Sequence, residues 1–228
     1  MDPLDAWYEA PLTTEDWLAG GSLLLLSAIF IPLYTYIAVF MVQRDKEIIG
    51  YRYLVSSAIA DILCMKVYGV FNGIAILAKS RLVSKDGRSG MQFYLDWVWF
   101  ACVLHYPIIA WSRFAAIRHP IWFGSQSRRL SYLIASTAFI GSLVLILCTH
   151  WQPFMARFYY EPAIYGIGVD DFIKYKTWGH YHMFIGIHIA CVVIPLVLYS
   201  WTILLLVPNR RFNTAFDSSR QRHQNIER

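Results

Sequence analysis

Four long stretches without a single Lys, Arg, Asp or Glu constrain the fold of this chain more than any other feature. They cover residues 17–43, 97–112, 130–156 and 177–209. A helix of about 20 apolar residues crosses the hydrocarbon core of a bilayer, and these stretches approach or exceed that length. The chain is 57% hydrophobic and only 15% charged, too little charge to cover a water-soluble domain of 228 residues. The sequence therefore predicts a multi-span membrane protein.

The apolar stretches and their borders predict an all-α membrane protein with five transmembrane helices. We place these helices at 18–42, 54–78, 92–117, 130–151 and 180–207, after an N-terminal segment 1–17 and before a basic tail 208–228. The first apolar run is not a secretory signal, because five acidic and no basic side chains precede it. All four Cys residues lie in apolar runs, so no disulfide scaffold is expected.

The distribution of Lys and Arg predicts the orientation in the membrane. With the N-terminus outside, twelve basic residues lie on the cytoplasmic side and seven on the outer side. Cytoplasmic loops carry the excess of basic residues in membrane proteins, so we expect the N-terminus outside and the C-terminus in the cytoplasm. The basic loop 79–90 opposes this assignment. The net charge of +5 suits a bilayer with anionic lipids and predicts no nucleic-acid partner.

Residues 111–123, WSRFAAIRHPIWF, span the end of the third predicted helix and place an Arg, an Ala-Ile pair and a Pro at fixed offsets. They resemble the rhodopsin-like G-protein-coupled receptor signature Asp/Glu-Arg-Tyr-x-Ala-Ile-x-x-Pro-Leu-x-Tyr. Arg113 matches the arginine, Phe114 stands for the tyrosine, and Ile117 and Pro120 match the isoleucine and the proline. Ser112 replaces the usual carboxylate, as in many nematode serpentine chemosensory receptors. The alternative is an Arg/Trp border at a helix end, which membrane helices commonly have.

This resemblance implies a chemosensory receptor with an unknown small-molecule ligand, in the plasma or ciliary membrane. Its G-protein-coupling residues would be Arg113, Phe114, Ile117 and Pro120, with a heterotrimeric G protein and other receptor chains as partners. In the family, the arginine holds inactive helices together and then turns to the G protein. Pro120 cannot continue the helix and would shape the following loop. The resemblance implies no enzyme activity and no cofactor.

A second, separate match lies in the second predicted helix. Residues 57–62, SAIADI, resemble the family pattern Leu-Ala-x-x-Asp-Leu, which makes Asp61 the polar activation site in mid-membrane. In the family, this aspartate lies in a polar cavity that binds sodium. A carboxylate at such depth costs a few kcal/mol unless it is paired or hydrated, so it is a functional candidate by default. The alternative is an aspartate that only holds the bundle together.

Five further residues are candidates for a ligand pocket, namely Lys66, Asp96, Trp97, Trp99 and His105. We expect Lys66 to face the bundle core and to pair with Asp96, because Lys66 points about 140° away from Asp61. A lysine that snorkels to the interface is the alternative, as is a lipid-facing belt for the two tryptophans. Amine receptors carry their aspartate at the position of Leu95, so the sequence does not predict an amine ligand.

Several marks of the family are missing. The first helix has no asparagine, and the fourth has no tryptophan at its middle. The family's disulfide between the third helix and the next outer loop cannot form, because Arg88 stands near the expected cysteine and 152–178 contains none. The family has seven helices, whereas five are predicted here. We therefore expect a receptor that is truncated after the fifth helix.

Histidines within or beside the apolar stretches support a rival interpretation, a multi-span haem or metal protein, since imidazole is a common ligand of both. A non-signalling membrane protein is a further alternative. No nucleophile elbow, phosphate loop or carboxylate pair indicates an enzyme. The histidines in question are His105, His150, His180, His182 and His188.

Overall fold

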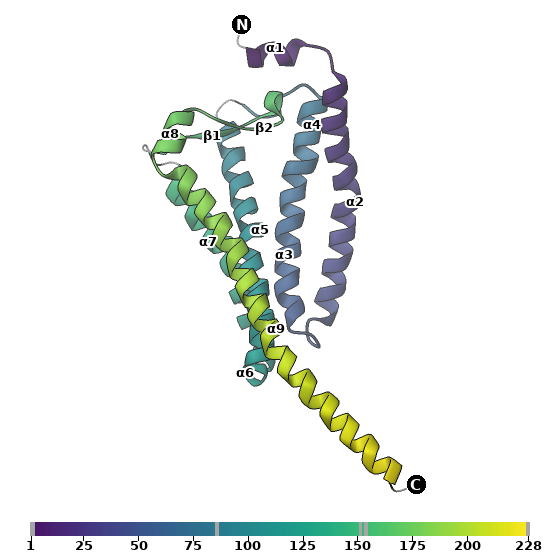
Figure 1. The fold of residues 1–228 in the computed structure, drawn as a ribbon. Coiled ribbons are helices and arrows are strands. Elements are labelled where there is room, and N and C mark those ends of the chain that lie inside the picture. Colours follow the sequence, from purple (N-terminus) through teal and green to yellow (C-terminus); the bar gives the residue numbers. More distant parts are fainter. Residues whose placement is uncertain (1–2, 85–86, 151, 153–154, 227–228) are drawn as a thin grey trace.

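The computed structural model describes residues 3–84, 87–150, 152 and 155–226, and it describes side chains only between Asp5 and Val207. Figure 1 shows an elongated bundle of long helices, with a short helix and a β-hairpin at one end. Five helical spans are long and apolar enough to cross a membrane, which confirms the predicted all-α membrane fold. These spans are Thr14–Arg44, Gly50–Leu77, Gly87–Arg118, Arg128–His150 and His180–Val207.

The elements follow one another with short connections, and the second span combines three helical segments. In chain order the elements are α1 (Pro3–Glu9), α2 (Thr14–Arg44), α3 (Gly50–Met65), the π-helical segment η1 (Lys66–Phe71), α4 (Asn72–Leu77), α5 (Gly87–Arg118), α6 (Pro120–Gly124), α7 (Arg128–His150), β1 (Phe158–Glu161), the 3₁₀ turn η2 (Pro162–Ile164), β2 (Gly166–Val169), α8 (Phe172–Thr177) and α9 (His180–Ile226).

The observed helix ends differ from the predicted ones where local hydrogen bonds or loops decide them. α2 begins at Thr14, four residues early, because Thr13 and Asp16 form a capping box at its first turn. The backbone of α9 stays helical to Ile226 although we predicted a tail from 208. The basic side chains of that tail lie outside the described residues, as do Lys85 and residue 151.

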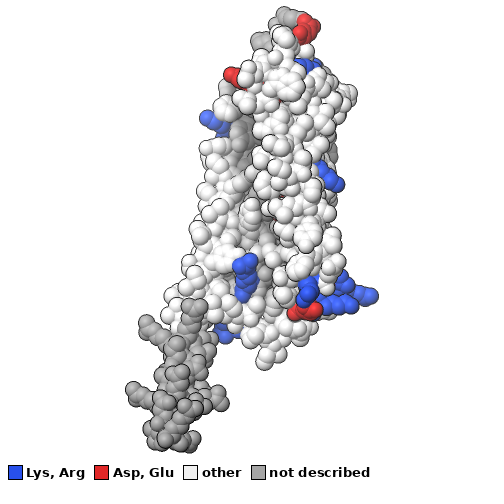
Figure 2. All heavy atoms as spheres, turned by 90° about the vertical axis from the view of Figure 1, so that its right-hand side faces the viewer, with Lys and Arg blue, Asp and Glu red and all other residues white. Residues whose placement is uncertain are grey.

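α5 is the central helix of the bundle. It packs against α3, α7 and α9, whereas α2 packs on the far side against α3, η1 and α4. A larger share of the apolar window is buried in α5 than in any other span. The outer helices turn large apolar side chains outward, as lipid-facing helices do. Uncharged residues dominate the face in Figure 2, and most charged side chains gather toward its two ends.

Glycines allow α2 to approach the second span closely. A Cβ on Gly69 would lie 1.8 Å from Ser27 Oγ, and one on Gly73 would lie 3.0 Å from the carbonyl oxygen of Gly20. Gly69 and Gly73 are four residues apart, the spacing that brings membrane helices into close contact. A larger residue at either glycine would therefore force α2 or its side chains to shift.

The β-hairpin was not predicted from the sequence. β1 and β2 are antiparallel, with Phe158 opposite Val169 and Glu161 opposite Gly166. η2 and Tyr165, which has a left-handed φ of 54°, connect the two strands. The hairpin and α8 cover one end of the bundle, as Figure 1 shows.

Candidate functional site

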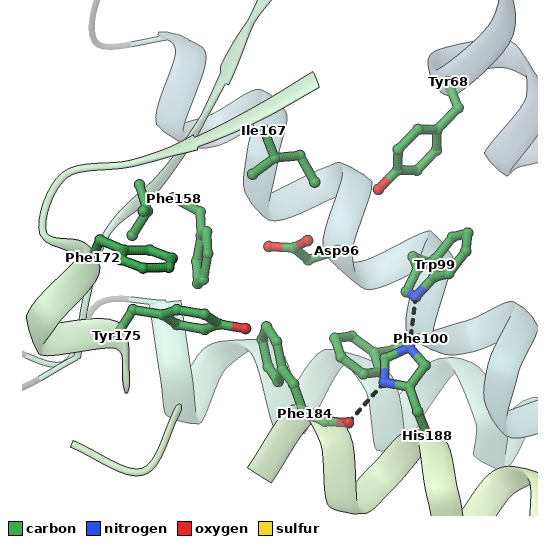
Figure 3. A pocket seen from close by; sticks show the side chains of 11 residues that line it. Tyr68, Asp96, Trp99, Phe100, Phe158, Ile167, Phe172, Tyr175, Phe184 and His188 are labelled. Carbon is green, nitrogen blue, oxygen red and sulfur yellow. Dashed lines mark hydrogen bonds between the residues drawn. The ribbon is translucent and has the colours of Figure 1, made fainter. Parts of the chain in front are cut away.

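A cavity of about 480 Å³ lies under the β-hairpin between α5 and α9. Its volume falls in the range of small-molecule sites, about 300–1,000 Å³. Figure 3 shows its lining, which comes from five parts of the fold. α5 supplies Asp96, Trp99 and Phe100; α9 supplies Phe184 and His188; η1 supplies Tyr68; the hairpin supplies Phe158, Ile167 and Val169; and α8 supplies Phe172 and Tyr175.

Among the described residues that line this cavity, Asp96 is the only one with an acidic side chain, and none is a Lys or an Arg. It is 8% exposed, and its Oδ1 accepts a hydrogen bond from Gln92 Nε2 at 2.8 Å. No ion pair reaches its carboxylate within the described residues. In Figure 3 the carboxylate points toward Phe158 across the cavity. A carboxylate buried without a cation is costly, and a positively charged group in the cavity would reduce that cost.

The walls around Asp96 are aromatic and fixed in place. Trp99 Nε1 donates to His188 Nε2 at 3.1 Å, and His188 Nδ1 donates to the carbonyl oxygen of Phe184 at 2.7 Å. Both imidazole nitrogens are therefore used, in a neutral ring that adds no positive charge. Phe100 and Phe184 pack with ring centroids 5.0 Å apart. Aromatic faces of this kind attract cations within about 6 Å.

Two other predicted ligand residues, Trp97 and His105, lie outside the cavity. Trp97 Nε1 donates to the carbonyl oxygen of Phe139 at 3.0 Å and so joins α5 to α7. His105 is fully buried; its Nδ1 donates to a backbone carbonyl of α5 at 2.6 Å. Its Nε2 then accepts from the Ser56 hydroxyl at 2.9 Å, which joins α5 to α3. Both side chains connect helices.

The predicted pair between Lys66 and Asp96 is wrong. Lys66 is exposed, and no ion pair involves it in the described part of the chain. The helix between Asp61 and Lys66 is α-helical as far as Met65, so the counted angle between the two side chains holds, but that angle did not determine which of them faces the bundle core. Asp96, by contrast, faces the cavity, and its neighbour Leu95 is buried against Ala75 and Tyr160.

The arginine end of α5 lies at the other end of the bundle, beside α6 (Figure 1). Arg113 is exposed, and its guanidinium carbon lies 5.9 Å from the ring centroid of Tyr199 on α9. Phe114 packs against Trp201 of α9 with centroids 5.2 Å apart. The Ser112 hydroxyl donates to the backbone carbonyl oxygen of Ile109 at 2.7 Å, and among the described residues no hydrogen bond joins it to Arg113.

The remaining residues of that motif mark the end of the helix. Ile117 is partly buried near the end of α5, and Pro120 is the exposed first residue of α6. The chain breaks the helix at His119, which has a φ of −133° and a ψ of 60°. A proline suits the first position of a new helix because its missing N–H needs no partner there.

Asp61 lies half-buried on α3, beside the thiol of Cys102 on α5. Cys64 also contacts Cys102, so the three side chains form a small polar cluster between the two helices. Within the described residues, no ion pair involves Asp61. The cluster is separate from the residues that line the cavity.

Sequence reasoning missed an ionic cluster above the cavity, which we call the hairpin clamp: Asp5, Tyr8, Arg81, Arg88 and Glu161. Glu161 is fully buried at the end of β1. It pairs with Arg88 at 2.5 Å and with Arg81 at 3.8 Å, and it accepts a hydrogen bond from the Tyr8 hydroxyl. Arg81 also pairs with Asp5 at 2.7 Å. The clamp therefore ties α1 and α5 to the hairpin, at the end of the bundle where the family has a disulfide that this sequence cannot form.

A second buried carboxylate adjoins the clamp. Asp16 of α2 is fully buried, pairs with Lys79 at 2.7 Å and accepts from the Tyr165 hydroxyl at 2.7 Å. The ammonium of Lys79 also lies 3.8 Å from the ring centroid of Trp7. One signal for these contacts was present in the sequence, namely an acidic segment 1–16 and a basic loop 79–90.

Burial beside Glu161 also changes the acidity of Tyr8. Desolvation of the phenol, followed by its hydrogen bond to the Glu161 carboxylate, raises the pKa of Tyr8. The phenol therefore stays protonated and remains a donor to Glu161 well into the alkaline range.

The α6 end of the bundle has its own buried polar network. Arg52 is 6% exposed and donates to the carbonyl oxygens of Asp45 and Gln126, at 3.0 and 3.1 Å. The Asp45 carboxylate accepts from Arg128 at 2.8 Å and from Tyr132 at 2.9 Å. The loops that precede α3 and α7 are thus held together, whereas Arg113 beside them has no ion pair within the described residues.

The remaining histidines are spread over the hairpin end. His150 Nε2 donates to the Ser89 carbonyl oxygen at 3.0 Å, and His180 is buried among aromatic rings, 4.5 Å from that of Phe184 between centroids. His182 is exposed. Among the described residues, no three His, Cys, Asp or Glu side chains converge on one point that could hold a metal ion.

Comparisons with known proteins support the fold. No protein-family model matches the sequence, and no curated protein matches it either. Among solved structures, the crystal structure of squid rhodopsin is similar to this chain, with a TM-score of 0.72 and 14% sequence identity. The similarity covers 96% of this chain and 63% of that chain, so this chain spans less than two thirds of the length of squid rhodopsin. The chain therefore has the fold of a rhodopsin-like helical membrane bundle.

Proposed function

We propose that this chain is a receptor of the rhodopsin-like kind, which binds a small organic cation in the cavity under the hairpin. The position of Asp96 carries the proposal: a buried carboxylate without a described ion-pair partner faces a cavity with aromatic walls. A cation with an apolar body would compensate the charge and stack against the rings. A chemosensory role fits such a ligand, as the resemblance of 111–123 implies.

The α6 end would contact a heterotrimeric G protein. Arg113 is exposed there, and Phe114, Ile117 and Pro120 surround it on α5 and α6. An arginine offers several donors in a fixed fork, which suits the carbonyl groups of a docked helix end. Because this chain covers 63% of the rhodopsin chain, we assign signalling to a form that contains a whole bundle. Transcript sequencing that revealed two further apolar spans would support that form.

The charges at the two ends support an orientation with the hairpin outside. Lys79, Arg81 and Arg88 from the basic outer loop are paired with buried carboxylates. Exposed basic side chains such as Arg113 and Arg129 remain at the α6 end, where the positive-inside rule expects them. An epitope placed before Met1 should be stained on intact cells in the plasma or ciliary membrane. Staining only after permeabilisation would contradict this orientation.

A thermal-unfolding screen tests the ligand class on the chain in detergent micelles. The probes are phenyltrimethylammonium, its uncharged analogue tert-butylbenzene, and benzoate. A ligand that binds the folded state raises its stability by about 2.7 kcal/mol at a concentration of 100 Kd. We expect the cation to raise the apparent Tm. The uncharged analogue and benzoate should each change it by no more than about 1 °C, which is the error of the assay.

The matched variants are Asp96→Asn and Asp61→Asn. Both remove one carboxylate from a membrane helix, but only Asp96 lines the cavity. The shift by the cation should disappear in Asp96→Asn and persist in Asp61→Asn. A shift of equal size in both variants, or an equal shift with benzoate, would refute the proposed ligand class. For signalling, Arg113→Leu in a full-length form should abolish the response in reporter cells while cation binding persists.

A further inference from the structure

A second cavity, of about 490 Å³, opens on the lipid-facing side near the α6 end. Its walls come from α5, α6, α7 and α9, and all of its lining residues are apolar or aromatic. Trp122 and Ile194 on its rim are 47% and 45% exposed. An apolar groove at this position in a membrane bundle faces hydrocarbon chains, so its natural guest is part of a lipid.

Two tryptophans form the end of the groove nearest the loop between α5 and α7. The rings of Trp111 and Trp122 meet edge to face, with centroids 6.0 Å apart. Within the described residues, neither indole N–H has a hydrogen-bond partner. Indole groups sit preferentially where hydrocarbon meets the polar part of a lipid, because the ring is apolar and the N–H is a donor. The groove therefore passes from an apolar interior to a border with free donors.

Arg118 continues the same face of α5 beyond the tryptophans. It lies seven residues after Trp111, which is two turns of helix on the same side and about 10 Å along the axis. Arg118 is exposed, and no ion pair involves it within the described residues. Its charge is therefore available to an anion at the polar end of the groove.

We propose that this groove binds one acyl chain of an anionic phospholipid, whose phosphate contacts Arg118. The guest must be apolar along most of its length, accept hydrogen bonds near Trp111 and Trp122, and end in a negative charge. A phospholipid meets all three requirements through its chain, ester carbonyls and headgroup. A sterol ends in a single hydroxyl group and would leave Arg118 without an anion.

Native mass spectrometry of the chain with added phosphatidylserine tests this site. Ile134→Trp fills the groove from α7, and Ile194→Trp fills it from α9 should the first variant fail to fold. Ile140→Trp is the matched control, because Ile140 lies on α7, is 55% exposed and is absent from the groove. Arg118→Gln removes the headgroup contact, and Arg129→Gln is its control at another exposed arginine.

The wild-type chain and both controls should retain one phosphatidylserine, in preference to phosphatidylcholine of the same chains. Groove filling should weaken retention at least tenfold, and Arg118→Gln about fivefold, the effect of one basic side chain on an anionic lipid. Undiminished retention in both groove-filling variants would overturn the proposal. Equal retention of phosphatidylcholine, or displacement of the phospholipid by cholesterol, would overturn the assigned guest.

Discussion

Glu161→Gln tests the hairpin clamp, because this carboxylate is fully buried and receives three partners. The substitution keeps the shape of the side chain and an acceptor for Tyr8 but removes the charge. Arg88, which is 12% exposed at its side chain, then loses its carboxylate. Removal of one partner from a buried ion pair costs about 3–5 kcal/mol, since the other charge stays buried and uncompensated.

The expected loss is at the lower end of that range, about 3 kcal/mol, because Arg81 keeps its contact with Asp5. For a chain of this size, that loss lowers the apparent Tm by about 6–12 °C. The assay heats the chain in detergent micelles with a thiol-reactive fluorophore, to which the buried thiols of Cys102 and Cys191 become accessible on unfolding.

Arg44→Gln is the control, because the pair of Arg44 with Glu47 is exposed on both sides, at 55% and 63%. An exposed pair contributes about 0–1 kcal/mol, so its removal should shift the apparent Tm by no more than about 4 °C. A double-mutant cycle of Glu161→Gln and Arg88→Gln should show a coupling energy above about 1 kcal/mol. Additive effects of the two substitutions would refute the account of the clamp.

Two further predictions concern packing and pH. Gly69→Ala should destabilise the chain by about 1–3 kcal/mol, because its Cβ would lie 1.8 Å from Ser27 Oγ. Gly21→Ala has open space within α2 and should stabilise the chain by up to about 1 kcal/mol, as alanine does in a helix interior. Equal apparent Tm values for the two variants would contradict the close contact. The raised pKa of Tyr8 means that its hydrogen bond to Glu161 is fully present below the unfolded pKa of about 10 and is lost as pH rises through the folded pKa. The difference in apparent Tm between wild type and Tyr8→Phe should thus be constant from about pH 7 to 9 and shrink above about pH 10, and a difference that grows there would contradict the assigned contact.

The membrane fold was predictable because a hydrocarbon core excludes charge over a fixed length. The uncharged stretch 177–209 and its neighbours therefore indicated the spans directly. The β-hairpin was not predictable in this way, since its strands have only four residues each. The hairpin is tied to the bundle through Glu161, whose partner Arg88 lies 73 residues earlier in the chain. A contact over such a distance leaves no local pattern in one sequence.

The sequence indicated which residue types belong to the candidate site, but not the direction in which each side chain points. Asp96 and Trp99 were singled out and line the cavity, whereas Trp97, only one residue from Asp96, points to α7. The direction of Lys66 was also predicted wrongly, because its angle from Asp61 does not say which side of the helix faces the core, and the side chain is exposed. The aromatic residues from the hairpin and from α8 were missed because their loop has no apolar period that places them over α5. The functional interpretation of Asp61 stays a prediction.

The affinity of wild type and of Asp96→Asn for phenyltrimethylammonium tests the central claim most directly. Equilibrium dialysis of the labelled cation against the chain in micelles gives both dissociation constants. Loss of one partner from a buried charge pair costs about 2–5 kcal/mol, so the variant should bind at least about 30-fold more weakly. Equal affinity of the two proteins, or absence of binding to a folded wild-type chain, would contradict a cation receptor built around Asp96.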